Sequence, residues 1–360
     1  MDRQSVIVPR LVAYGSDAIN KISDLCKKLN LKSLLLVSGS SNTKNITEKE
    51  IKPLITKSFN LKVMHLDNNI SDLDNINKIR SEINSKQVQL AVVAIGGGKI
   101  MDIVKVATHK SIVPWISIPT SASHDGFSSP FINFILRERL KKANLPIPKS
   151  NSPLAIIGDT SLISRAPFEH VIAGVGDLLA KTVAVKDWQL ATRIRGEYYD
   201  EYAATFGLMS ARIVEEGYKI ISKGKEPGIR LVVKALGNSG IAMAIAGNTR
   251  PASGSEHLIS HYLDKMSHEQ KNFIPNRHGF QVGLASVLCC YLQGGKWKNI
   301  LNILSALKHP ITANELGLDK EILLEAMINA HKIRPERYTV LGNGLTKKSA
   351  LKALEATGIA

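Results

Sequence analysis

Three residues with metal-binding side chains stand in the second half of the chain. Asp177 ends the run GVGD (174–177), His257 ends SGSEH (253–257), and His278 lies just before a glycine. Catalytic zinc sites take three protein ligands from His, Asp, Glu or Cys and keep one position open. The chain has neither an HExxH nor a CxxC motif, but its helical half has Asp177, His257 and His278 near expected helix starts, as candidate ligands. Spacing alone does not rank this trio above other combinations.

Each candidate also has a structural alternative. Asp177 precedes a helical pattern and suits an N-cap, where a carboxylate accepts free N–H groups. Ser253 and Glu256 have the spacing of a capping box, which places His257 in the first turns of a helix. A helix N-terminus disfavours imidazolium and so maintains the neutral form that a metal needs. His261 is four residues from His257, so one of the two can bind metal while the other contacts a substrate.

A glycine-rich run in the first half has the chemistry of a dinucleotide site. Residues 96–102, GGGKIMD, follow the apolar strand pattern LAVVAI and begin a helix near Met101. Glycines permit a positive φ in such a turn and let a pyrophosphate approach the backbone, while the helix N-terminus supplies free N–H groups. The spacing is neither GxGxxG nor that of a P-loop. The alternative is a tight turn with Asp102 in a local ion pair.

A second loop with ligand-binding groups follows the next strand pattern. The segment IPTSASHDGFSSP (118–130) is almost entirely small, polar and turn-forming, so its hydroxyl and N–H groups can reach a ligand. An ordinary serine-rich turn around Asp125 is the alternative. Because two such loops follow successive strands, we favour a ligand site.

The elements that must position these residues change in character along the chain. Apolar strand patterns separated by helical ones predict a parallel sheet of βαβ units, covered on both faces. The strand patterns are at 31–40, 61–66, 90–98, 115–123 and 154–160. Long helical patterns follow at 177–195, 201–222, 229–247, 255–265 and 278–292. We predict a dinucleotide-binding α/β domain over 1–165 and an all-helical metal- and substrate-binding domain over 166–360.

Composition limits the possible functions. The 360 residues are 44% hydrophobic and 22% charged, as in a globular protein with two cores. The net charge of +16 favours anionic ligands, with a lysine-rich solvated surface as the alternative. Aromatic content of 5%, without a basic stripe, disfavours nucleic-acid binding. Three cysteines without a pairing motif, no signal core and no run of eighteen apolar residues predict a cytoplasmic protein without a membrane span.

Together the motifs resemble the glycerol-1-phosphate dehydrogenase family, in the superfamily of dehydroquinate synthases and metal-dependent alcohol dehydrogenases. The resemblance rests on GGG (96–98) with Asp102, on PTSASHDG (119–126), on GVGD (174–177), on His257 with His261, and on His278-Gly279. The SHDG stretch discriminates most, because the similar glycerol dehydrogenases usually carry another sequence there. The resemblance covers roughly residues 5–300. Residues 131–150 depart from it as a basic, partly helical insertion.

The resemblance implies an N-terminal Rossmann-like domain, a C-terminal helical domain and a set of residue roles. It implies catalytic roles for Asp125, Asp177 and His261 at the substrate, and one zinc ion per chain held by Asp177, His257 and His278. It implies dinucleotide contacts from Gly96, Gly97, Gly98, Lys99, Asp102, Thr120, Ser121, Ser123 and Ser129. Nickel or iron suits the same ligand set. No acidic residue follows the early strand at 38–41 to reject NADPH, so dual use of NADH and NADPH is compatible with the sequence.

The implied reaction is reversible reduction of dihydroxyacetone phosphate to sn-glycerol 1-phosphate with NAD(P)H, for archaeal-type phospholipid synthesis. Zinc would serve as a Lewis acid at the ketone oxygen. The substrate phosphate needs cationic or N–H partners, which the motifs do not identify. We expect a homo-oligomer without a nucleic-acid partner. The alternatives are a glycerol or other polyol dehydrogenase on the same scaffold, a dehydroquinate synthase-like lyase, and a nucleic-acid binder.

Overall fold

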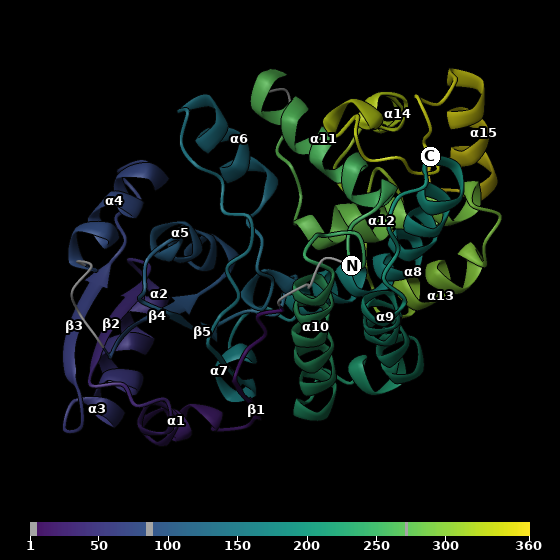
Figure 1. Cartoon of the computed structure of the whole chain (residues 1–360). Helices are drawn as coiled ribbons and strands as arrows, with labels where there is room; N and C mark the ends of the chain where they lie inside the picture. The colour runs from purple at the N-terminus through teal and green to yellow at the C-terminus, as the bar shows by residue number, and fades with distance from the viewer. Residues whose placement is uncertain (1–5, 84–88, 271–272) are drawn as a thin grey trace. The chain divides into compact units, whose positions relative to one another are not determined.

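A computed structural model describes residues 6–83, 89–270 and 273–360, which form two compact units (Figure 1). The first unit consists of Met1–Ala122 and Gly126–Ala166. The second consists of Ser123–Asp125 and Pro167–Ala360. A short segment that follows a strand of the first unit is therefore part of the second.

Six parallel strands form the sheet of the first unit, which confirms the predicted parallel α/β fold. Their order is β1-β6-β5-β4-β2-β3. Their bounds are β1 (Leu11–Gly15), β2 (Ser33–Ser38), β3 (Asn60–His65), β4 (Leu90–Gly96), β5 (Trp115–Pro119) and β6 (Ala155–Asp159). The sequence patterns identified all of these except β1. Most of the residues of β1 are only partly buried, as befits an edge strand, and its apolar run LVAY is short.

Helices cover both faces of this sheet (Figure 1). Figure 1 shows α4 and α5 on one face and α1 and α3 on the other. Alternate residues of the central strands, such as Leu34, Leu36 and Val93, share one core with Ile22 and Ile55 of the latter helices. The helices of this unit are α1 (Ile22–Lys28), α2 (Asn42–Ile46), α3 (Lys52–Ile55), α4 (Asp72–Glu82), α5 (Gly98–Thr108), α6 (Phe134–Lys142) and α7 (Thr160–Ile163). Short 3-10 or π turns are Ala18–Lys21, Thr47–Ile51 and Asp125–Phe127.

The sheet has one topological switch point. β2 and β4 are neighbours, but the chain leaves β2 toward β3 at one edge and leaves β4 toward β5 on the opposite side. In open α/β sheets, ligands bind beyond the carboxyl ends of two such strands. The glycine run follows β4 at this point, and α5 begins in it at Gly98.

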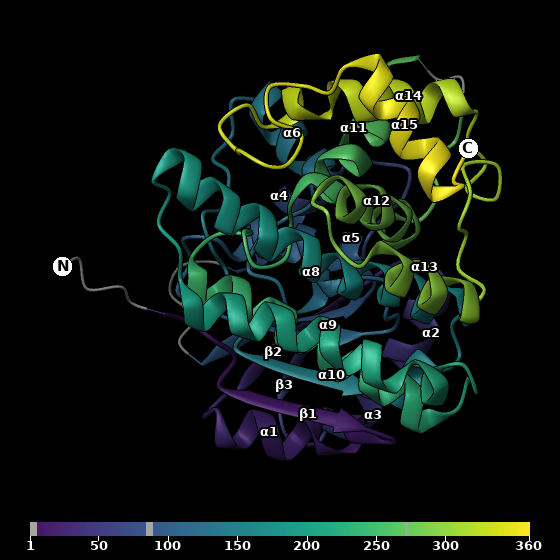
Figure 2. The ribbon, with the colours of Figure 1, turned by 90° about the vertical axis from the view of Figure 1, so that its right-hand side faces the viewer.

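All the regular secondary structure in the described residues of the second unit is helical, again as predicted. Its helices are α8 (Glu169–Arg195), α9 (Glu201–Ile221), α10 (Glu226–Ala246), α11 (Ser255–Gln270), α12 (His278–Leu292), α13 (Trp297–Ala306), α14 (Lys320–Asn329) and α15 (Lys347–Thr357), with the 3-10 turn η4 (Ala330–Ile333). Figure 2 shows α9 and α10 packed along one another. Local sequence sets several ends: Gly196 and Gly247 adopt left-handed conformations after α8 and α10, and Asp200 caps α9.

Among the described residues, one helix is long and apolar enough to cross a bilayer by length and composition. This helix is α10, and 72% of its apolar window is buried inside the protein. Such burial is typical of a core helix.

Glycines allow α8 and α12 to approach very closely. A Cβ added to Gly279 of α12 would lie 2.0 Å from the carbonyl oxygen of Ala173 in α8. A Cβ on Gly176 would lie 2.2 Å from the carbonyl oxygen of Gly279, and one on Gly283 would meet His309 at 2.4 Å. Real Cβ atoms do not approach backbone oxygens this closely, so only glycine permits this spacing.

We expect Gly279→Ala to lower the free energy of unfolding by about 3 kcal/mol, because overpacking forces the two backbones apart. Gly217→Ala is the matched control. This helical glycine of α9 would place its Cβ 3.0 Å from the flexible end of Leu231, and alanine is the better helix former. Urea unfolding followed by circular dichroism measures both. Equal stability of the two variants would show that the α8–α12 spacing tolerates a methyl group.

Candidate active site

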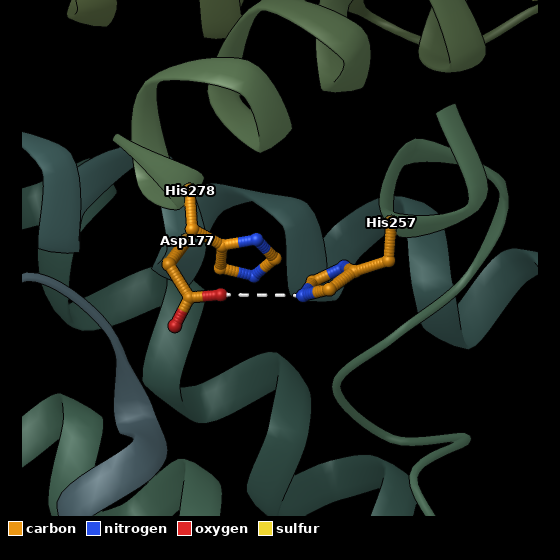
Figure 3. Close-up of side chains that lie close together, drawn as sticks. All are labelled: Asp177, His257 and His278. Atoms are coloured by element: carbon orange, nitrogen blue, oxygen red, sulfur yellow. Dashed lines mark ion pairs between the residues drawn. The ribbon is translucent and has the colours of Figure 1, made fainter. Parts of the chain in front are cut away.

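Three side chains from three helices of the second unit converge as a candidate metal centre. Asp177 comes from α8, His257 from the start of α11 and His278 from the first position of α12. One ligand atom from each lies within 4.8 Å of the other two. His257 Nε2 is 3.4 Å from Asp177 Oδ1, and Figure 3 shows the His278 ring turned toward this pair. A carboxylate and two imidazoles at this spacing fit one divalent transition metal ion.

Asp177 lies inside a helix, so the N-cap alternative for this residue is wrong. The helix extends over Glu169–Arg195 and begins eight residues before the predicted start at 177. Glycines at 174 and 176 interrupt the pattern expected from sequence, but the helix continues through them because α12 packs against this turn. The Asp177 side chain therefore points from the middle of a buried helix into the site.

Hydrogen bonds leave the Nε2 atom of each histidine available to a metal. His257 Nδ1 donates to Glu256 Oε1 at 2.7 Å. The Ser260 hydroxyl donates to Gln281 Oε1 at 2.9 Å, so its oxygen accepts from His278 Nδ1 at 3.2 Å. A histidine that donates from Nδ1 carries its lone pair on Nε2. Side chains behind the candidate ligands thus select the tautomer that binds a metal.

The electrostatic surroundings of the three residues also suit a cation. Burial opposes ionisation of Asp177, but Lys181 and the hydrogen bond with His257 hold the pKa of this carboxyl well below its usual value. Burial lowers the pKa of His278 well below 6.5. Burial acts the same way on His257, but hydrogen bonds with Asp177 and Glu256 outweigh it and raise the pKa. A bound metal ion would take the place of the proton that these hydrogen-bond acceptors stabilise on His257.

A buried lysine joins the metal candidates to Asp125. Lys181 Nζ is 3.0 Å from Asp177 Oδ1 and 2.9 Å from Asp125 Oδ2. Ser239 donates to the same Asp125 oxygen at 2.7 Å, and the Asp125 N–H donates to Asp177 Oδ2 at 3.1 Å. Burial lowers the pKa of Lys181, but its two carboxylate partners raise it overall, so the ammonium persists. Lys181 was not among the predicted residues, although its spacing of four from Asp177 places both on one helix face.

His261 completes this group. Its ring lies 6.0 Å from that of His257 and stacks on His278 at 5.9 Å, both measured between ring centroids. His124, which was not among the predicted residues, stands edge-on to His278 at 6.0 Å. The second unit therefore brings together Asp125, Asp177, His257, His261 and His278. Ser123, predicted to bind cofactor, belongs to the same unit.

The other predicted cofactor residues lie at the carboxyl ends of β4 and β5. These strands are neighbours, with Gly96 opposite Pro119, and the Thr120 N–H donates to the Gly96 carbonyl at 3.1 Å. Gly96 has a φ of +154°, and its Cβ would meet Ile100 at 2.3 Å, so a side chain is excluded there. Gly97 caps α5 without a side-chain hydrogen bond, and a Cβ on it would meet nothing within 4 Å. The open N-terminus of α5 is therefore a suitable place for a phosphate.

Three residues assigned to the cofactor by resemblance have contacts within the first unit. Asp102 is buried, and its carboxylate accepts from Lys105 Nζ at 3.0 Å and from the Asn133 backbone N–H at 3.0 Å. This is the local ion pair named as the alternative. Ser129 is buried and accepts from the Phe131 N–H, and exposed Lys99 pairs with Asp72 at 3.2 Å. Thr120 and Ser121 are partly exposed at the loop itself.

The chain is similar, first, to a broad class of known proteins. Residues 13–167 match the family model of iron-containing alcohol dehydrogenases. The structure of glycerol dehydrogenase from Schizosaccharomyces pombe superposes with a TM-score of 0.75 at 20% identity, covering 99% of this chain and 91% of that one. At this identity the likeness shows the fold, which is that of the iron-containing alcohol dehydrogenases.

Curated relatives are more specific. Glycerol-1-phosphate dehydrogenase of Pyrococcus horikoshii is 41% identical over 98% of both chains. Its counterpart in Methanosarcina acetivorans is 38% identical over 98% of this chain and 96% of its own length. The chain belongs to the glycerol-1-phosphate dehydrogenase family, as its motifs indicated.

Glu256 provides a test of how the candidate ligands are held. Its Oε1 accepts from the Gly254 N–H and from His257 Nδ1, both at 2.7 Å, and so orients the imidazole. We expect Glu256→Ala to weaken zinc binding about 10- to 100-fold, as for other groups that orient metal ligands. Glu256→Gln should lose less, because its amide oxygen still accepts. Chelator competition on the folded protein measures this affinity.

Glu216→Ala is the control for these variants, since this exposed glutamate of α9 pairs only with Arg212 in the described structure. Its zinc affinity should equal that of the unmodified protein. If Glu256→Ala bound zinc as tightly as this control, Glu256 would have no part in orienting His257.

Proposed function

We propose that this protein catalyses NAD(P)H-dependent reduction of dihydroxyacetone phosphate to sn-glycerol 1-phosphate. The observation that carries the proposal is the convergence of Asp177, His257 and His278 beside Asp125 and His261, in a chain whose relatives are glycerol-1-phosphate dehydrogenases. The relatives' names specify NAD(P)+ as coenzyme. The product would serve as the backbone of archaeal-type phospholipids.

Asp177, His257 and His278 would hold one zinc ion, and nickel or iron fits the same donors. Such a cation supplies Lewis-acid stabilisation of the charge that develops on the carbonyl oxygen during reduction. Asp177 and Asp125 both pair with the Lys181 ammonium, which would hold their carboxylates in place at the substrate. His261, largely neutral because burial and nearby positive charges lower its pKa, can hydrogen-bond a substrate hydroxyl.

For the coenzyme, we propose contacts from the loops after β4 and β5. Gly96, Gly97 and Gly98 offer backbone approach and the start of α5 to a pyrophosphate, and Thr120, Ser121, Ser123 and Ser129 add hydroxyl groups. Lys99 and Asp102 complete the set implied by resemblance, although the bonds of Asp102 to Lys105 and Asn133 favour a role in holding the loop around Ser129. Exposed Lys99 is free to act as a cation for phosphate once it leaves Asp72.

Glycerol dehydrogenase is the second candidate, favoured by the structural likeness to enzymes of that name. The two candidates differ in whether the substrate carries a phosphate. A cytoplasmic homo-oligomer remains our expectation for either, and its assembly state can be read from light scattering.

Oxidation of NADH and NADPH should be followed at the nicotinamide absorbance band with dihydroxyacetone phosphate and with dihydroxyacetone. We expect oxidation with the phosphorylated ketone, its loss after chelation, and its recovery with zinc. Oxidation with dihydroxyacetone alone would assign the protein to the polyol dehydrogenases. Absence of oxidation with either ketone in the zinc-loaded, folded protein would refute both candidates.

His257→Ala tests the metal assignment in the same assay. We expect this variant to lose both turnover and bound metal while keeping its helical circular dichroism, because one of three ligands is gone. His268→Ala is the matched control, an exposed histidine on the same helix α11. Turnover of His257→Ala equal to that of this control would remove His257 from the site.

A further inference from the structure

Two arginines that follow η4 lie close to the helix of His257 and His261. The turn η4 packs against α11, and Arg334 is the first residue after this turn. Three residues later, Arg337 Nη1 donates to the Ser253 carbonyl at 2.5 Å and Nη2 donates to Thr249 Oγ1 at 2.7 Å. These bonds fix the Arg337 guanidinium to the loop from which α11 begins.

The Arg337 guanidinium has no acidic partner in the described part of the chain. No carboxylate oxygen lies within ion-pair distance, 4.0 Å, of its nitrogens there. Its two hydrogen bonds use two of the five N–H groups that a guanidinium carries, so most of its donors remain for a ligand. Neighbouring Arg250 is different, because Glu197 pairs with it and the Tyr338 carbonyl accepts from it at 2.9 Å.

Arg250, Arg334 and Arg337 bring positive charge to this part of the second unit, and Glu197 and Glu256 offset part of it. Burial, then Arg334 and Arg250, lower the pKa of Arg337 to about 9, which still leaves it charged at neutral pH. The turn η4 that precedes both arginines packs against α11, the helix that carries His261, and Arg337 is bonded to the loop from which that helix begins. The arginines therefore lie beside the helix of the histidine that was assigned to the substrate, and an anion bound there would relieve their mutual repulsion.

We propose that Arg337, together with Arg334, binds the phosphate group of the substrate next to His261. This inference rests on the proposed function, and it names the phosphate partners that the sequence motifs did not provide. A phosphate monoester dianion has three acceptor oxygens that match the fork of a guanidinium. The 2′-phosphate of NADPH has the same chemistry, so the experiment compares both sources.

The test is steady-state kinetics of Arg337→Gln with each ketone and each coenzyme. We expect the KM for dihydroxyacetone phosphate to rise about 10- to 100-fold, the usual effect of losing a charge-assisted hydrogen bond. The loss should be much smaller with dihydroxyacetone than with its phosphate, and the ratio of NADPH to NADH use should not change. Arg337→Lys should recover part of the loss, since it keeps the charge without the fork. Arg334→Gln should likewise lose more activity with dihydroxyacetone phosphate than with dihydroxyacetone.

Arg212→Gln is the matched control, because this exposed arginine of α9 already pairs with Glu216. Its kinetics should equal those of the unmodified protein. Equal losses of Arg337→Gln with both ketones would overturn the proposal by showing that Arg337 only supports the fold. A loss confined to NADPH would overturn it by assigning the arginines to the coenzyme.

Binding of inorganic phosphate separates this inference from the proposed function. Calorimetry should show that Arg337→Gln binds inorganic phosphate about tenfold more weakly than the unmodified protein. If the unmodified protein does not reduce dihydroxyacetone phosphate, the proposed function fails, and this comparison still decides the anion site. Equal phosphate affinity in the two proteins would refute the anion site even if the reductase activity is present.

Discussion

The close approach of α8 and α12 is the constraint on which the candidate metal centre depends. Asp177 directly follows Gly176, and His278 directly precedes Gly279, the two glycines whose missing Cβ atoms allow the contact. The distance between α8 and α12 therefore sets the distance between Asp177 and His278. Any side chain that separated the backbones would also separate a carboxylate from an imidazole that must reach one ion.

Charged side chains that lie this close together and are buried away from water need partners of opposite charge. Burying an ion is costly unless its partners are in place, and the groups nearest the candidate ligands have them. Lys181 lies between two carboxylates, and Glu256 accepts from both a backbone N–H and an imidazole. A further carboxyl, Asp187, has its pKa raised to about 6, first by burial and then by Glu256. The site is thus a network in which single charges cannot be removed without leaving another unpaired.

Sequence reasoning succeeded where one strong local signal sufficed. The apolar strand before the glycine run and the long helical patterns of the second half are such signals, and so are the motifs of the family. Prediction from sequence failed for β1, whose apolar run LVAY is short, and for the start of α8, where glycines that serve packing resemble a helix boundary. The supporting roles of Lys181, Glu256 and Ser260 became visible only in three dimensions. Lys181 also pairs with Asp125 from a distant loop, Ser260 accepts from His278 of another helix, and Glu256 orients the ring of its neighbour His257.

The path of the chain limits how this protein can be divided. It passes from one unit to the other after Ala122, returns after Asp125, and leaves again after Ala166. A fragment that begins at Pro167 would contain every helix of the second unit but lack Asp125, and buried Lys181 would keep only one of its two carboxylate partners. Exchange of the helical unit between related enzymes by a single crossover would therefore separate a lysine from its counter-ion. We expect functional recombinants to be those in which residues 123–125 and the helices come from the same parent enzyme.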